Sequence, residues 1–273
     1  LIKYIKMKLE EIFSRLWEIY IQQNPSAKKV YDLFLSKGER VINDHIAFRT
    51  YNHPSINIDV LSEAFIRNGY KFVASYDFPD KHLNAKHFEH PEMPELPRIF
   101  ISELITEKFS PELQSTVKQL VESIDFGEMN KVEMIFSGRL WGQASFETYN
   151  KLRNESEYAA WLYYNGFVAN HFTVSVNFLI NYPTMSSVNN LLKENGFTIN
   201  SSGGEIKGTP EEFLEQSSIM ADITTGEFIE GNYDITGCYY EFAKRYPDLN
   251  GNLYSGFIAK SADKIFESTN MKR

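Results

Sequence analysis

A histidine and an arginine share one short, largely apolar run, N-D-H-I-A-F-R-T, which spans residues 43–50. Side chains alternate between the two faces of a β-strand, so His45 and Arg49 would share one face, and Ile46 and Phe48 the other. The apolar pair marks the face that packs on a core. The face that carries His45 and Arg49 must therefore meet solvent, a polar partner or a site. A site is possible because an imidazole can ligate a metal ion and a guanidinium can hold a carboxylate.

A second histidine occupies the corresponding place in a faint internal repeat. His45 precedes a segment of helical periodicity that ends at Asn68-Gly69, and His171, in N-H-F-T-V-S-V-N, precedes another that ends at Asn195-Gly196. Asn-Gly is typical of a helix end. The order of histidine strand, helix, Asn-Gly stop and strand thus occurs twice. Pseudo-twofold pairing of the two histidine strands would bring both imidazoles to one cavity, where they can converge on a metal.

A third ligand is available in the stretch G-C-Y-Y-E-F-A-K-R. Glu241 follows an aromatic run and shares a strand face with Tyr239, an unusual place for a carboxylate unless it is paired or ligating. A carboxylate is also the expected ligand type, because the chain has a single cysteine. Two histidines and one carboxylate form the facial triad that suits non-haem Fe(II) with open positions for substrate and dioxygen. We therefore predict that His45, His171 and Glu241 bind a metal.

The elements that must position these residues indicate an α+β fold. Each half continues into further strand-like runs, K-F-V-A-S-Y and Arg98 to Leu104 in the first, T-I-N-S and Gly237 to Phe242 in the second. We predict two pseudo-repeated β-α-β-β-β modules, about residues 41–125 and 165–270, that form a central curved sheet around the metal site, with added helices. No linker-like tract interrupts the sequence, so residues 1–273 are expected to form one integrated domain.

The N-terminal segment, residues 1–40, is expected to be helical. Apolar residues recur there at helical spacing: Ile5, Leu9, Ile12, Phe13, Leu16, Trp17 and Tyr20. Charged residues interrupt the stretch, which argues against a signal peptide or a membrane span. We expect an amphipathic helix that packs on the body of the domain. A helix on a membrane surface is the alternative, disfavoured by the acids on its polar face.

Composition and charge limit the possible partners. The chain has 273 residues, 42% of them hydrophobic, which is enough for a sizeable core. A net charge of -8 argues against a general nucleic-acid binder, which needs a basic surplus to displace counterions from phosphates. Cys238 is the only cysteine, so no internal disulfide forms and a reducing, cytoplasmic setting is expected. Nothing in the sequence indicates an oligomeric state.

Several longer motifs together resemble one family. They are D-H-I-A-F-R-T, L-P-R-I-F-I-S-E-L-I-T-E-K-F-S-P-E-L-Q, E-Q-S-S-I-M-A-D, Y-Y-E-F-A-K-R and S-A-D-K-I-F-E-S-T. In this order, from about residue 40 onward, they resemble the 2-oxoadipate dioxygenase/decarboxylase (hydroxyglutarate synthase) family, in its compact plant-type branch. The resemblance implies a vicinal-oxygen-chelate fold like that of glyoxalases. It also implies an Fe(II) enzyme that converts 2-oxoadipate and dioxygen to 2-hydroxyglutarate and carbon dioxide in lysine breakdown.

The resemblance implies roles for individual residues. His45, His171 and Glu241 become the iron ligands, the same three residues that the strand and repeat patterns select. Arg49 matches the family's substrate arginine, and its position on the strand face of His45 would let it clamp a carboxylate beside the metal. The two histidines would then also contact the substrate.

Further substrate contacts are expected from two later motifs. Ser261, in A-K-S-A-D-K-I-F, matches a substrate-contacting serine of the family, and the backbone at Lys260 would contribute. Gln216 belongs to E-Q-S-S-I-M-A-D and is a further candidate for lining the pocket. A simple junction after Thr209-Pro210 would explain that motif nearly as well.

Two other functions remain open. A glyoxalase-like lyase or isomerase would use Zn or Ni as a Lewis acid and consume no dioxygen. Sites of that type more often use two carboxylates, whereas only Glu241 is evident in this sequence. A non-catalytic small-molecule binding module of the same fold is the other alternative, since a fold by itself does not establish activity.

Purely structural roles are the alternatives for several polar residues. Arg49 could pair with an acid such as Asp44 or Glu103 at the sheet edge. A cluster of histidines also resembles a metal site by count, but it lies in a polar, Pro-bounded, hairpin-like segment. Solvated strand and loop positions are expected for all of them: His82, His87 and His90.

Overall fold

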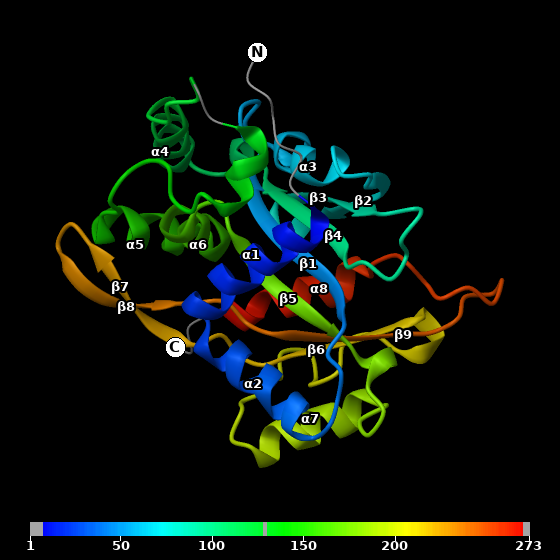
Figure 1. Cartoon of the computed structure of the whole chain (residues 1–273). Coiled ribbons are helices and arrows are strands. Elements are labelled where there is room, and N and C mark those ends of the chain that lie inside the picture. The colour runs from blue at the N-terminus through cyan, green and yellow to red at the C-terminus, as the bar shows by residue number, and fades with distance from the viewer. Residues whose placement is uncertain (1–7, 128–129, 270–273) are drawn as a thin grey trace.

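The computed structural model describes residues 8–127 and 130–269 (Figure 1). Its helices are α1 (Leu9–Gln23), α2 (Pro25–Ser36), α3 (Ile58–Ile66), α4 (Pro111–Glu122), α5 (Phe146–Glu155), α6 (Glu157–Asn165), α7 (Met185–Glu194) and α8 (Ala259–Phe266). Its strands are β1 (Asn43–Tyr51), β2 (Lys71–Phe78), β3 (Leu83–Glu89), β4 (Arg98–Leu104), β5 (Ala169–Ser175), β6 (Leu214–Ser218), β7 (Ile223–Phe228), β8 (Gly231–Thr236) and β9 (Glu241–Arg245). None of the helices in these residues is long and apolar enough to cross a membrane.

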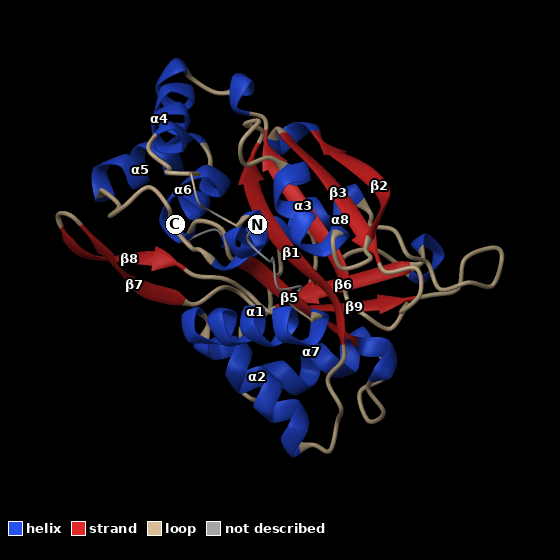
Figure 2. Ribbon diagram, turned by 45° about the horizontal axis from the view of Figure 1, so that its top comes forward, coloured by secondary structure: helices blue, strands red, loops and turns tan. Residues whose placement is uncertain are grey.

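Seven strands form one curled sheet in the order β2-β3-β4-β1-β5-β9-β6 (Figures 1 and 2). The first module, β1-α3-β2-β3-β4, has the predicted order. Its β1 pairs antiparallel with β5, and the Ile46–Phe172 pair lies between the rows of His45 and His171. Parallel pairing of β1 with β4 is repeated by β5 with β9. The pseudo-twofold repeat is therefore confirmed, with the two histidines placed symmetrically about its centre.

The second module, β5-α7-β6-β9, departs from the prediction at its outer edge. The stretch T-I-N-S forms only an isolated bridge, between Ile199 and Ile219, instead of a full strand. Its side chains explain the difference, because Asn200 Nδ2 donates to the Lys264 carbonyl (3.0 Å) and to Ser268 Oγ (2.8 Å) at the end of α8. The hairpin β7-β8 is an insertion with its own two-stranded sheet, which projects from the body in Figure 1.

The strand that carries Glu241 is shorter at its start than predicted. The run from Gly237 to Phe242 was expected to be a strand, but β9 begins at Glu241. Side chains replace the sheet partners before that point: Cys238 N–H donates to Asn24 Oδ1 (2.6 Å), and Trp161 Nε1 donates to the Gly237 carbonyl (3.1 Å). Glu241 is thus the first residue of its strand.

The two faces of the sheet have different coverings. On one face, Phe48 packs on Phe65 of α3 with ring centroids 5.5 Å apart, and Phe172 packs on Trp17 of α1 at 5.1 Å. Alternation along the strands places the two repeat histidines on the opposite face. That face is covered by α8, which contacts β2 and β6. The curl of the sheet and α8 thus enclose the predicted site.

The N-terminal helix packs on the body of the protein, as predicted. Ile12, Leu16 and Tyr20 are buried in the core, so the apolar face of α1 is not available for a membrane surface. The apolar position Ile5 lies outside the described residues. Helix α1 ends before Pro25, which lacks an N–H and begins α2. The N-terminal segment therefore contains two helices.

Candidate metal centre

Three predicted ligands converge from adjacent strands. His45 on β1, His171 on β5 and Glu241 on β9 each offer a ligand atom, and these atoms all lie within 4.8 Å of one another. His171 Nε2 is 3.1 Å from Glu241 Oε2, and His45 Nε2 is 3.7 Å from Glu241 Oε1. All three side chains are at most 5% exposed. The repeat and the position of Glu241 therefore predicted a group that the structure brings together.

The orientation of His45 is set by an anchored carboxylate. His45 Nδ1 lies 2.9 Å from Asp44 Oδ2. Arg245 donates to both oxygens of Asp44, from Nε at 2.7 Å and from Nη2 at 2.9 Å. Burial alone would raise the pKa of Asp44, but the charge of Arg245 and these hydrogen bonds hold it well below its usual range. Because an ionised carboxylate only accepts, His45 carries its proton on Nδ1, and its Nε2 lies 3.0 Å from the Thr173 hydroxyl oxygen and 3.7 Å from Glu241 Oε1.

His171 is oriented in the same way by its own neighbour. Its Nδ1 lies 3.0 Å from Asn170 Oδ1, which leaves Nε2 facing Glu241. Burial lowers the pKa of His171 below 6.5, although the charge of Glu241 opposes this shift. Burial would raise the pKa of Glu241, but His45 and His171 lower it overall. Two imidazole Nε2 atoms and an ionised carboxylate are therefore aimed at one point, and this donor set fits a divalent cation.

Glu241 has one further partner. Gln216 on β6 donates from Nε2 to Glu241 Oε1 at 2.6 Å, while its own Oε1 has no hydrogen-bond partner within the described part of the chain. Gln216 also lines the cavity around the three ligands. Contact of Gln216 with a substrate stays a prediction.

Arg49 is buried without a charged hydrogen-bond partner at two of its nitrogens. Its side chain is 2% exposed, and within residues 8–127 and 130–269 neither Nε nor Nη1 has a partner. The rings of Tyr158 and Trp161 lie 4.9 and 5.0 Å from the guanidinium carbon. The alternative pairings are not formed, since Asp44 binds Arg245 and Glu103 accepts from the Ile58 N–H (3.1 Å). Burial lowers the pKa of Arg49, yet a guanidinium remains a cation that needs an anion.

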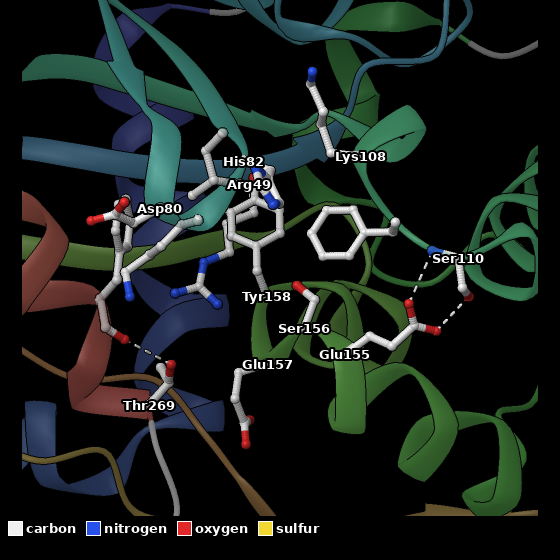
Figure 3. A pocket seen from close by; sticks show the side chains of 14 residues that line it. Arg49, Asp80, His82, Lys108, Ser110, Glu155, Ser156, Glu157, Tyr158 and Thr269 are labelled. Carbon is white, nitrogen blue, oxygen red and sulfur yellow. Dashed lines mark hydrogen bonds between the residues drawn. The ribbon is translucent and has the colours of Figure 1, made fainter.

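Two cavities share a lining residue of α8. A small one of about 20 Å³ is lined by the three ligands together with Gln216, Tyr239, Phe100, Phe257, Ala262, Ile265 and Phe266. A larger cleft of about 520 Å³ contains Arg49 and opens to the surface, where Glu155 binds Ser110 (Figure 3). Phe266 lines both. Phe266 is therefore a shared wall of the cleft that contains Arg49 and the cavity that contains the metal ligands.

The α8 residues predicted to contact substrate lie at the edge of this arrangement. Ser261 is buried, and a Cβ placed on Gly208 would lie 3.3 Å from its Oγ. Lys260 lies on the outer side of α8, in a separate cleft with Asp77 and Asp80. Neither residue lines the small cavity, and their substrate roles stay predictions.

His87 and His90 were wrongly expected at solvated positions, whereas His82 is half-buried in a turn. His87 is fully buried on β3, where Nδ1 bonds the Tyr76 hydroxyl (2.9 Å), and His90 is 7% exposed against the ring of Tyr70. Strand β3 is interior, because β2 and β4 flank it, so alternation buries His87. His82 adopts a left-handed turn with φ of 53°. These three side chains point to different neighbours and do not converge.

Sequence reasoning missed the residues that orient the ligands. Asp44 was considered only as a partner for Arg49, and Arg245 and Asn170 were not considered at all. A signal was present, because each repeat histidine directly follows a residue that can accept from its Nδ1, in D-H and in N-H. Arg245 gave no such signal, since it is 201 positions from Asp44.

Comparison with known proteins assigns the family. Residues 12–251 match the family described as 2-oxoadipate dioxygenase/decarboxylase. The chain belongs to this family. A relative from rice (Oryza sativa subsp. japonica), the chloroplastic/amyloplastic 2-oxoadipate dioxygenase/decarboxylase, is 34% identical over 282 residues, which cover 94% of this chain and 78% of the relative. The family resemblance of the sequence motifs is thereby confirmed.

Solved structures agree with this assignment. A hydroxyglutarate synthase from Oryza sativa in complex with 2-oxoadipate has a TM-score of 0.87 at 33% identity, covering 94% of this chain and 90% of that one. A protein from Shewanella frigidimarina NCIMB 400, described as a candidate hydrolase, has a TM-score of 0.85 at 48% identity, covering 92% and 97%. A candidate glyoxalase-superfamily protein from Ralstonia eutropha JMP134 shares the fold, with a TM-score of 0.70 at 20% identity over 89% and 83% of the chains.

Proposed function

We propose that this chain is an Fe(II)-dependent dioxygenase/decarboxylase that converts 2-oxoadipate and dioxygen to 2-hydroxyglutarate and carbon dioxide. The observation that carries the proposal is the buried convergence of His45, His171 and Glu241, with the incompletely paired Arg49 guanidinium on the same strand face as His45. The rice relative bears this activity in its name, and the rice structure contains 2-oxoadipate. Under this proposal the chain acts in lysine breakdown, and its lone buried thiol suits a reducing, cytoplasmic setting.

The proposed reaction balances without a further oxidant or reductant. Carbon dioxide carries away the C1 carboxyl group with both of its oxygen atoms. Both atoms of dioxygen remain in the five-carbon product, one in the new carboxylate and one in the new hydroxyl group. Bound Fe(II) would supply chelation of the 2-oxo acid and activation of dioxygen, for which two imidazoles and one carboxylate leave open positions.

The protein's own residues would bind the acid and exclude water. Arg49 suits a substrate carboxylate, because Nε and Nη1 of its planar fork are buried and have no partner among the described residues. Phe257, Ile265 and Phe266 give the metal cavity apolar walls. That cavity has room for about one water molecule. Entry of a 2-oxo acid from the larger cleft therefore requires side chains of α8 to move.

Oxygen uptake by the reconstituted protein tests the proposal. The protein is loaded anaerobically with Fe(II) and then mixed with oxygenated buffer and either 2-oxoadipate or 2-oxohexanoate, which lacks the distal carboxylate. We expect uptake of dioxygen and release of carbon dioxide in equal amounts with 2-oxoadipate, and much slower turnover with 2-oxohexanoate. Background uptake with these and with other 2-oxo acids would contradict the dioxygenase proposal.

A metal-dependent hydrolase, lyase or isomerase is the second candidate. The Shewanella relative, described as a candidate hydrolase, and the shared glyoxalase-superfamily fold favour it. A single carboxylate among the converging ligands disfavours it. Such an enzyme would turn over without dioxygen when loaded with Zn or Ni, so anaerobic activity separates it from the proposed function.

A further inference from the structure

Tyr239 lines the metal cavity and has a buried hydroxyl group without a hydrogen-bond partner among the described residues. Its side chain is fully buried, and it lines the small cavity beside His171, Gln216 and Glu241. Its ring stacks on the ring of His171, with centroids 4.7 Å apart and planes at 27°. The hydroxyl oxygen has no hydrogen-bond partner within residues 8–127 and 130–269. A buried hydroxyl without a partner is unfavourable, so a polar atom that enters the cavity would bind there favourably.

The position of Tyr239 is fixed by its backbone. Its carbonyl oxygen accepts a hydrogen bond from the Tyr20 hydroxyl of α1, and the adjacent Cys238 N–H donates to Asn24 Oδ1. The next residue, Tyr240, points the other way and packs on Trp17, with ring centroids 5.7 Å apart. This alternation holds the ring of Tyr239 toward the metal ligands.

The Tyr239 hydroxyl can donate a hydrogen bond, because an ordinary phenol keeps its proton at neutral pH. Two other residues with unmet hydrogen bonds among the described residues are Gln216, whose Oε1 accepts and which lines the cavity, and Arg49, whose Nε and Nη1 donate and which lies in the larger cleft. An anionic oxygen atom in the cavity could accept from the phenol, and a guanidinium also pairs with such anions.

We propose that Tyr239 is a catalytic residue whose hydroxyl donates a hydrogen bond to the 2-oxo acid head group bound at the His45, His171 and Glu241 centre. This inference rests on the proposed function. The stacked ring would support His171, and the hydroxyl would fix the rotation of the bound head group. Neither the strand pattern nor the motif resemblance assigned Tyr239 such a role.

Replacement of Tyr239 by Phe tests the hydroxyl separately from the ring. The stacking on His171 is kept, so we expect unchanged iron content and an unchanged melting temperature. A hydrogen bond to a charged group corresponds to a loss of about tenfold to a hundredfold in affinity. We expect this loss in the dissociation constant of 2-oxoadipate, measured by calorimetry on the anaerobic Fe(II) protein, and a similar fall in kcat/KM.

Tyr240→Phe is the matched control. The Tyr240 hydroxyl is also buried without a hydrogen-bond partner among the described residues, but Tyr240 does not line the metal cavity. This variant should bind and turn over 2-oxoadipate within twofold of the parent. Parental affinity and turnover in Tyr239→Phe, or equal losses in both variants, would overturn the proposed role. A parent protein that neither binds 2-oxoadipate nor consumes dioxygen would instead overturn the proposed function itself.

Discussion

Replacing Asp44 by Asn should weaken metal binding while keeping the size of the side chain. Both oxygen atoms of Asp44 accept hydrogen bonds. Oδ2 accepts from His45 Nδ1 and Arg245 Nη2, and Oδ1 accepts from Arg245 Nε. An amide has one oxygen, and its NH₂ group would face an N–H donor on one side. His45 would then lose the acceptor that fixes both its tautomer and its ring orientation.

The structure sets the expected magnitudes. Loss of a partner that orients a metal-bound histidine typically reduces metal affinity about 10- to 100-fold, or about 1.4 to 2.8 kcal/mol. Arg245 would also become a buried cation without its carboxylate, which costs about 3 to 5 kcal/mol in folding stability. Its Nη1 keeps the Tyr254 and Gly256 carbonyls at 3.0 and 2.7 Å, so we expect the lower end of this range.

Metal affinity is measured anaerobically by competition with a chelator, and stability by urea unfolding of the metal-free protein. Asp59→Asn is the control, because the Asp59 side chain is 71% exposed and forms an ion pair with Lys86 at the surface. It should change neither quantity appreciably. If Asp44→Asn does not fold, Arg245→Lys keeps the charge but loses the two-pronged contact. Parental metal affinity in a folded Asp44→Asn or Arg245→Lys protein would refute the orienting role.

Three further predictions concern other residues. Arg49→Ala should keep its iron but lose about 1.5 to 3 kcal/mol of transition-state stabilisation, measured from kcat/KM for 2-oxoadipate. Lysine at this position should restore little of the activity. Near-parental kinetics in Arg49→Ala would place Arg49 outside the site. His171→Ala should stay soluble and lose most bound iron by elemental analysis, whereas full iron and turnover would exclude β5 from the centre. Burial lowers the pKa of His87 below 6.5, so the unfolded chain takes up this proton first as the pH falls. The metal-free protein should therefore lose stability below about pH 6.5, and urea unfolding should show a shallower loss in His87→Gln; an unchanged slope would contradict the assignment.

Local patterns predicted the parts of the fold that depend on local physics. Two local signals predicted the order of strands and helices in both modules. They are the alternation in N-D-H-I-A-F-R-T and the helix ends at Asn68-Gly69 and Asn195-Gly196. The repeat then placed His45 and His171 in neighbouring strands, because a pseudo-twofold fold pairs equivalent elements.

Features that depend on distant partners were not predictable in this way. The stretch T-I-N-S does not form a full strand at the edge of the second module, because Asn200 binds the C-terminal end of α8. The burial of His87 follows from the position of β3 between two other strands. The polar residues next to His87 in the sequence had instead predicted an exposed position. Contacts of this kind join residues far apart in the sequence, and single-residue properties do not encode them.

The fate of the oxygen atoms tests the central claim most directly. The Fe(II) protein is mixed with 2-oxoadipate and dioxygen labelled with oxygen-18, and the product acid and the carbon dioxide are analysed by mass spectrometry. The account predicts 2-hydroxyglutarate that carries both labelled atoms, one in the carboxylate and one in the hydroxyl group, together with unlabelled carbon dioxide. A product acid without label, or turnover that continues without dioxygen, would contradict it.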